Sequence, residues 1–105
     1  MSHRIEVFEQ MLEDDPGATM VMFGLANEYL KAGETEKSVA MFERYLKFGT
    51  DEGAGYGMLA KALEELGDRE KARTAYEKGI ETALAHGHPS MAEDFRFTLE
   101  NEYGD

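Results

Sequence analysis

The feature that most constrains this chain is a stretch of sequence that repeats after 34 residues. Shifting the chain by that distance aligns MFGLANEYLKAGETEKSVAMF (residues 22–42) with YGMLAKALEELGDREKARTAY (residues 56–76) and places Gly33 on Gly67. The matched positions hold the same or similar residues, namely Leu25 with Leu59, Ala26 with Ala60, Lys37 with Lys71, and Phe42 with Tyr76. A unit of this length cannot bury its apolar side alone, so the units must stack on one another.

The spacing of apolar residues indicates that each unit is helical. Apolar residues recur three and four positions apart, as Ile5, Phe8 and Leu12 do, and no segment alternates with a period of two. Glycine and proline mark the helix ends, and short linkers make neighbouring helices antiparallel. We therefore predict an all-α fold with helices over residues 1–15, 18–32, 35–48, 51–66, 68–86 and 89–103.

These units resemble the tetratricopeptide repeat family, whose 34-residue unit is a helix, a turn and a second helix. The family's run of aromatic, leucine, small residue and tyrosine is matched by Met22, Leu25, Ala26 and Tyr29, and again by Tyr56, Leu59, Ala60 and Leu63. The resemblance implies a short right-handed α-solenoid of about six helices in a single domain, residues 1–105. Its parts would be a half-repeat helix (1–15), two repeats (18–50 and 51–86) and a C-terminal capping helix (89–103).

Composition excludes several classes of function. The chain has 105 residues, no cysteine and a net charge of −11. Thiol catalysis and cysteine-bound zinc are therefore excluded, and the negative charge repels phosphate backbones and anionic lipid, so neither nucleic acid nor a membrane is the expected partner. No apolar run approaches the roughly 20 residues needed to span a bilayer, and the N-terminus lacks a secretion signal. These features fit a cytoplasmic protein.

The glycine-rich stretch GAGYGML (residues 53–59) raises the question of a phosphate-binding loop. Such a loop follows a strand and leads into Lys-Ser or Lys-Thr, and neither feature is present. The repeat register instead places the glycines in the first turns of a helix capped by Thr50. Gly55 would let the preceding helix approach closely, and Gly57 would leave room on the opposite side.

The helix over residues 18–32 carries a second apolar stripe in addition to its packing side. In tetratricopeptide repeat proteins the first helix of each pair lines the concave surface that holds peptide or helical ligands. Carried over, the partner-binding residues here are Met20, Phe23, Gly24, Asn27, Leu30, Lys31, Ala54, Gly57, Met58 and Lys61. The resemblance implies a non-catalytic module that binds an apolar peptide or helix of another protein, with or without basic flanks. A clamp for acidic chaperone tails is not expected, because Phe23 and Met58 replace two of its polar residues.

Two alternatives to this groove remain open at the level of sequence. The sixth helix could fold over the groove and make Met20 and Phe23 ordinary core residues, or the same apolar surface could form a homodimer seam. Phe97, among acidic residues of the last helix, is a second candidate for self-association. His86 and His88 do not specify a metal geometry, and the paired acids lack a nucleophile beside them. We expect no enzymatic activity, no metal and no cofactor.

Overall fold

The computed structural model describes residues 3–104, which form six helices and no strand. Residues 1–2 and 105, which the predicted domain includes, lie outside this range. The helices are α1 (His3–Asp14), α2 (Thr19–Lys31), α3 (Thr35–Leu46), α4 (Ala54–Glu65), α5 (Arg69–Ala85) and α6 (Pro89–Glu102). The all-α class predicted from the apolar spacing is confirmed.

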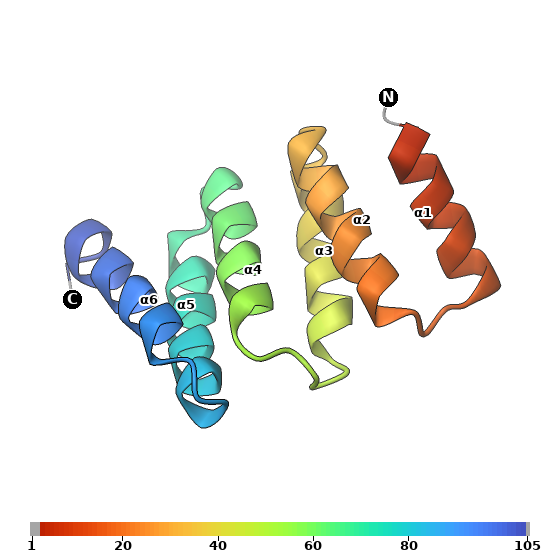
Figure 1. Ribbon diagram of the computed structural model, residues 1–105. Coiled ribbons are helices and arrows are strands. Elements are labelled where there is room, and N and C mark those ends of the chain that lie inside the picture. Colours follow the sequence, from red (N-terminus) through yellow and green to blue (C-terminus); the bar gives the residue numbers. More distant parts are fainter. Residues whose placement is uncertain (1–2, 105) are drawn as a thin grey trace.

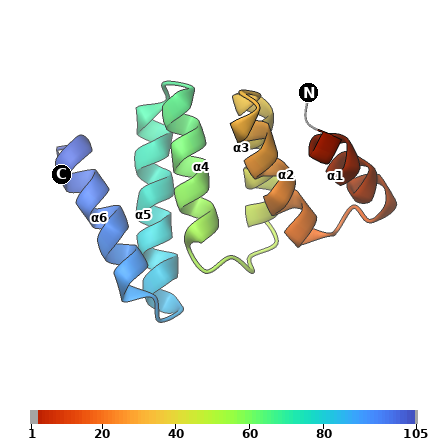
Figure 2. The ribbon, with the colours of Figure 1, turned by 45° about the horizontal axis from the view of Figure 1, so that its top comes forward.

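The helices form an elongated stack of antiparallel neighbours (Figure 1). Each helix packs against the next one along the chain. On one side of the stack lie α2, α4 and α6, while α3 and α5 lie behind α2 and α4; Figure 2 shows the same order after rotation. The stack measures 41 × 28 × 18 Å, as expected for units that contact only their neighbours.

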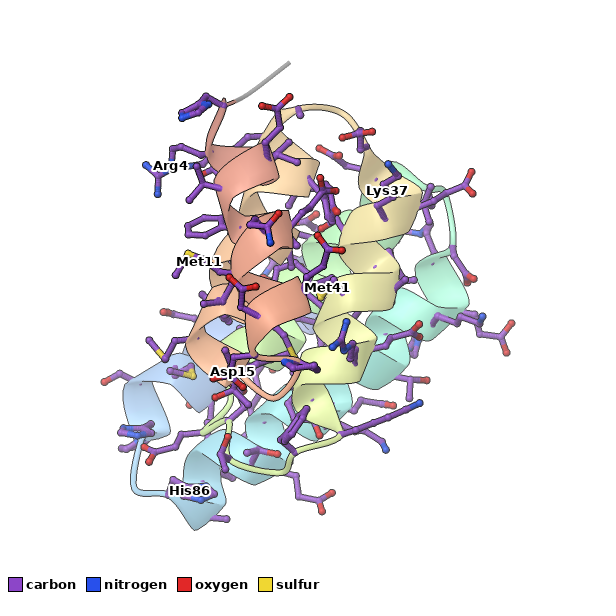
Figure 3. The ribbon with its side chains drawn as sticks, turned by 90° about the vertical axis from the view of Figure 1, so that its right-hand side faces the viewer. Arg4, Met11, Asp15, Lys37, Met41 and His86 are labelled. Carbon is purple, nitrogen blue, oxygen red and sulfur yellow. The ribbon has the colours of Figure 1, made fainter. Side chains whose placement is uncertain are left out.

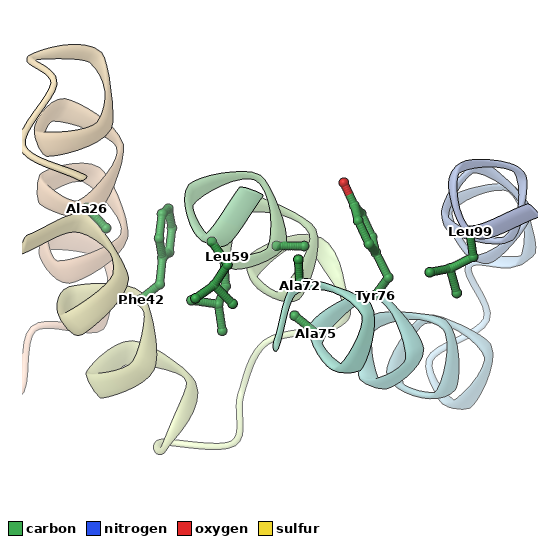
Figure 4. Close-up of a cluster of buried hydrophobic side chains, with 9 residues drawn as sticks. Ala26, Phe42, Leu59, Ala72, Ala75, Tyr76 and Leu99 are labelled. Atoms are coloured by element: carbon green, nitrogen blue, oxygen red, sulfur yellow. The ribbon is translucent and has the colours of Figure 1, made fainter. Parts of the chain in front are cut away.

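The interior consists of two clusters that are joined by shared side chains. The larger cluster extends from α2 to α6 and includes Phe42 and Tyr76, which lie on opposite sides of α4 (Figure 4). The smaller cluster joins α1 to α2 through Ile5 and Met22. Met41 packs against both clusters, so the apolar interior is continuous along the stack.

The repeat extends to the backbone geometry at the ends of α2 and α4. Gly33 and Gly67 both adopt a left-handed conformation, with φ of +80° and +82°. After Gly33 the N–H of Glu34 donates to the carbonyl of Tyr29 at 2.9 Å, and the same bond recurs at 2.9 Å after Gly67. This arrangement satisfies helix-end carbonyls and favours glycine, which confirms both residues as helix terminators.

The start of α4 differs from the sequence prediction. Gly53 is the N-cap residue, with φ of +128°, and the side chain that accepts the free N–H groups is that of Asp51 rather than Thr50. One carboxylate oxygen of Asp51 accepts the N–H groups of Gly53 and Gly55, each at 2.9 Å, and the other accepts the hydroxyl of Tyr45 at 2.8 Å. A charged acceptor satisfies more of the free N–H groups than a hydroxyl can, and it also fastens α3 to α4.

Glycines let aromatic rings approach the neighbouring helix closely. A Cβ atom on Gly24 would lie 3.2 Å from the ring of Phe8 on α1, and one on Gly55 would lie 2.8 Å from the ring of Tyr45 on α3. The predicted role of Gly55 in close packing is therefore confirmed. At both joints the missing side chain provides the space that the ring occupies.

Gly57 does not leave room for a partner as predicted. A Cβ atom there would lie 2.6 Å from the ring of Phe95, and one on Gly79 would lie 2.8 Å from the same ring. Phe95 of α6 thus lies between a glycine of α4 and a glycine of α5. The space expected to be open is filled from within the chain.

We predict that Gly57→Ala destabilises the protein. Alanine is favoured over glycine within a helix by about 1 kcal/mol, but overpacking a filled site costs about 1–3 kcal/mol, so the free energy of unfolding should fall. Denaturant titration measures it. In a Phe95→Ala background the ring is gone and Gly57→Ala should stabilise instead. If Gly57→Ala raised the free energy of unfolding both in wild type and in Phe95→Ala, the result would contradict this packing.

Candidate partner-binding face

The residues predicted to bind a partner lie on α2 and α4, on the side of the stack that also carries α6 (Figure 1). We call this surface the front face, and its predicted members are Met20, Phe23, Gly24, Asn27, Leu30, Lys31, Ala54, Gly57, Met58 and Lys61. They differ widely in exposure. Met20 is 79% exposed, Lys31, Ala54 and Lys61 are exposed, and Asn27, Leu30 and Met58 are half-buried.

Phe23 serves the core at least as much as the front face. Its ring is half-buried and makes edge contacts with Phe42 at 5.8 Å and Tyr45 at 5.3 Å between ring centroids. The repeat register superimposes Phe23 on Gly57, the position where Phe95 inserts its ring. One ring therefore fills this space in each repeat. In the first repeat it is the ring of Phe23, and in the second it is the ring of Phe95 from α6.

Gly24 also lies at a filled position, because the ring of Phe8 covers it. Of the two predicted glycines, neither opens space for a ligand. The sixth helix covers the Gly57 position of α4 through Phe95, which agrees in part with the self-covering alternative, while Ala54 and Lys61 stay exposed. It leaves Met20 uncovered, so the α2 part remains accessible.

Hydrogen bonds and ion pairs orient the polar groups of the front face. The side-chain amide of Asn27 donates to the carbonyl of Phe23 at 3.1 Å, which fixes the orientation of the amide. Glu28 is buried to 9% exposure between two cations, Arg4 at 3.7 Å and Lys31 at 3.6 Å. This end of the face therefore combines an apolar surface with positively charged groups.

Residues of α1 extend the apolar surface in a way that the sequence reasoning missed. Met11 is 42% exposed and Val7 is 41% exposed, so neither side chain is buried by the packing of α1. Met11 and Arg4 extend from α1 on the side away from α3 (Figure 3). The signal was present in the sequence: α1 has more apolar residues than one neighbouring helix can cover.

At the C-terminal end of α4, Glu64 accepts hydrogen bonds from two tyrosines. Tyr76 donates to one carboxylate oxygen at 3.2 Å and Tyr103 to the other at 2.7 Å. Burial and the charge of Glu64 raise the pKa of Tyr76, and burial and the hydrogen bond raise the pKa of Tyr103 to about 12. The guanidinium of Arg69 lies 4.2 Å from the Tyr103 ring centre. These contacts fasten the end of α6 to α4 and α5.

Two more tyrosines join helices in the same manner. Tyr29 donates to Glu9 of α1 at 2.5 Å, and Tyr45 donates to Asp51 at 2.8 Å. Burial, followed by these hydrogen bonds, raises the pKa of both tyrosines. Carboxylate–tyrosine bonds thus hold the α1–α2 joint, the α3–α4 joint and the C-terminal joint.

The histidines of the loop before α6 serve separate partners. His88 lies 2.6 Å from Glu52, and His86 lies 2.9 Å from the carbonyl of Thr82. In residues 3–104 no group of three histidine, aspartate or glutamate side chains could share a metal ion. None of the helices in that range combines the length and apolar character required to cross a membrane.

The fold and this face define a helical repeat protein with a mixed apolar and basic surface on one side. The family model described as "Tetratricopeptide repeat" matches residues 54–86. The chain is 36% identical over 83 residues to the TPR repeat-containing protein PA0015 of Pseudomonas aeruginosa, covering 79% of each chain. The chain belongs to the tetratricopeptide repeat family. Repeats of this family generally mediate protein–protein interaction and are typically non-catalytic.

A solved structure has the same fold. The solution structure of protein BPP2914 from Bordetella parapertussis superimposes with a TM-score of 0.79 at 24% identity. The match covers 95% of this chain and 87% of that one. The stacked arrangement of helices is therefore shared across almost the whole chain.

We expect the protein to lose stability as the pH rises from about 10 toward 12. The folded state holds the protons of Tyr29, Tyr45, Tyr76 and Tyr103 more tightly than the unfolded chain does. The free energy of unfolding is therefore undiminished below about pH 10 and falls as the pH approaches the raised pKa values. Melting temperature and tyrosinate absorbance, both followed against pH, measure the effect.

A pair of variants tests the origin of this dependence. Glu64→Gln removes the charge beside two tyrosines and should move part of the tyrosine ionisation to lower pH. Glu77→Gln, at an exposed position of α5, should leave the titration unchanged. Ionisation of the four tyrosines near pH 10 in the folded protein would contradict the assignment.

Proposed function

We propose that this chain is a non-catalytic interaction module that holds an apolar peptide or helical segment of another protein against its front face. The observation that carries the proposal is the exposure of Met20 on α2, whose side chain is 79% exposed. Near the other end of the same helix, Leu30 is half-buried. A partner that covers an exposed apolar side chain gains free energy from its burial, and methionine adapts to irregular apolar shapes.

The charge of the chain favours basic residues at the ends of the bound segment. A net charge of −11 attracts cations over distances of about 10 Å at moderate salt. Near the apolar surface itself, Lys31 and Lys61 are exposed and can receive backbone carbonyls or a carboxylate of the segment. Covering one methionine contributes roughly 1.5–3 kcal/mol before ordering costs, which suits an exchangeable contact.

The test compares partner binding by wild type and Met20→Glu. Proteins retained by the immobilised chain are identified, and the bound segment is titrated as a synthetic peptide by calorimetry. We expect at least about tenfold weaker binding by Met20→Glu, with the melting temperature unchanged because the side chain is exposed.

Leu84→Glu is the matched control, since Leu84 of α5 is also exposed, to 46%, and lies outside the front face. It should bind like wild type. Undiminished binding by Met20→Glu, or an equal loss in both variants, would contradict the proposal.

Self-association through α6 is a second candidate because Phe97 is 67% exposed. Two copies would each carry a net charge of −11, so association should strengthen with salt, which screens the repulsion. Sedimentation velocity over a concentration series, comparing wild type with Phe97→Ser, tests this. A monomer throughout would eliminate the candidate.

A further inference from the structure

A cavity lies away from the front face, between α3 and α5. It has a volume of about 420 Å³ and is lined by Glu43, Leu46, Lys47, Tyr56, Leu59, Leu63, Lys71, Thr74, Ala75 and Lys78. We call it the rear groove. Both α3 and α5 pack on α4, so α4 provides the floor and the other two helices provide the walls.

The floor of the rear groove is apolar and rigidly held. Leu59 and Leu63 belong to the main core cluster and are 8% and 4% exposed. Tyr56 and Leu46 are half-buried beside them. A cavity of this size, with an apolar floor and a few polar groups at its edge, has the form of a binding site.

The rim carries an excess of positive charge. Three lysines line the groove, Lys47, Lys71 and Lys78, against the single acid Glu43, in a chain whose net charge is −11. Within residues 3–104 none of these lysines pairs with a carboxylate, whereas Lys31 and Lys37 both have such partners within 4 Å. The positive charge of the rim is therefore available to a ligand.

We propose that the rear groove binds an acidic amphipathic segment of a partner protein. Apolar side chains of the segment would cover Leu59 and Leu63, and carboxylates on either side would pair with the lysines. A narrow segment can enter this local positive region, whereas a broad anionic membrane would face the repulsion of the whole chain. A second copy of the chain would face the same repulsion.

The probe is a synthetic peptide in which leucine and phenylalanine, spaced three and four residues apart, are separated by glutamates. A second peptide has lysine in place of each glutamate. Fluorescence anisotropy at low salt measures binding to the full chain. We expect preference for the acidic peptide, weakening as salt is added, and roughly three- to tenfold weaker binding by the double variant Lys71→Gln and Lys78→Gln.

Front-face variants separate this proposal from the proposed function. Met20→Glu and Lys61→Gln should leave binding of the acidic peptide unchanged. In wild type, addition of the acidic peptide should shift the methyl resonances of Leu46 and Leu63. Equal binding of both peptides would overturn the proposal, as would loss of binding in the front-face variants alone. The proposal would also be overturned if the chain bound anionic phosphatidylglycerol vesicles in preference to the acidic peptide. Loss of peptide binding when the chain dimerises would overturn it as well.

Discussion

Three close contacts between helices of this stack depend on an aromatic ring that occupies the space left by a glycine. Phe8 lies over Gly24, Tyr45 lies against Gly55, and Phe95 inserts between two glycines of α4 and α5. Helical glycine is unfavourable by about 1 kcal/mol relative to alanine, and close packing of a ring offsets that cost. The glycines therefore set how near the helices lie and, through that distance, which side chains reach the surface.

The same constraint shapes the front face. Shifting by one repeat places Phe23 on Gly57 and Phe42 on Tyr76, and the ring pairs Phe23–Phe42 and Phe95–Tyr76 both have centroids 5.8 Å apart. The two repeats thus build one aromatic pair from different sources. Because these rings are used internally, the front face presents chiefly Met20 as an exposed apolar residue. Leu30 is half-buried near the other end of α2, and Lys31 and Lys61 are exposed.

Much of the architecture could be predicted because it is recorded in local patterns. The period of 34 residues and the terminators Gly33 and Gly67 gave the number and order of helices. Whether the space beside a helical glycine is open or filled could not be predicted, because it depends on rings from helices that are distant in sequence. The ring of Phe95 beside Gly57 is the example. The lysines of the rear groove were likewise missed, because Lys47 follows α3 and Lys71 lies in α5, and they line one groove only in the stack.

The central claim is that the α2 part of the front face is the surface that a partner protein covers. Methionine methyl resonances test it most directly, because the chain has seven methionines distributed between surface and core. On addition of a partner segment, the account predicts that the Met20 methyl shifts and broadens while that of Met22, which is fully buried, stays unchanged. An unmoved Met20 resonance in the presence of a bound segment would contradict it.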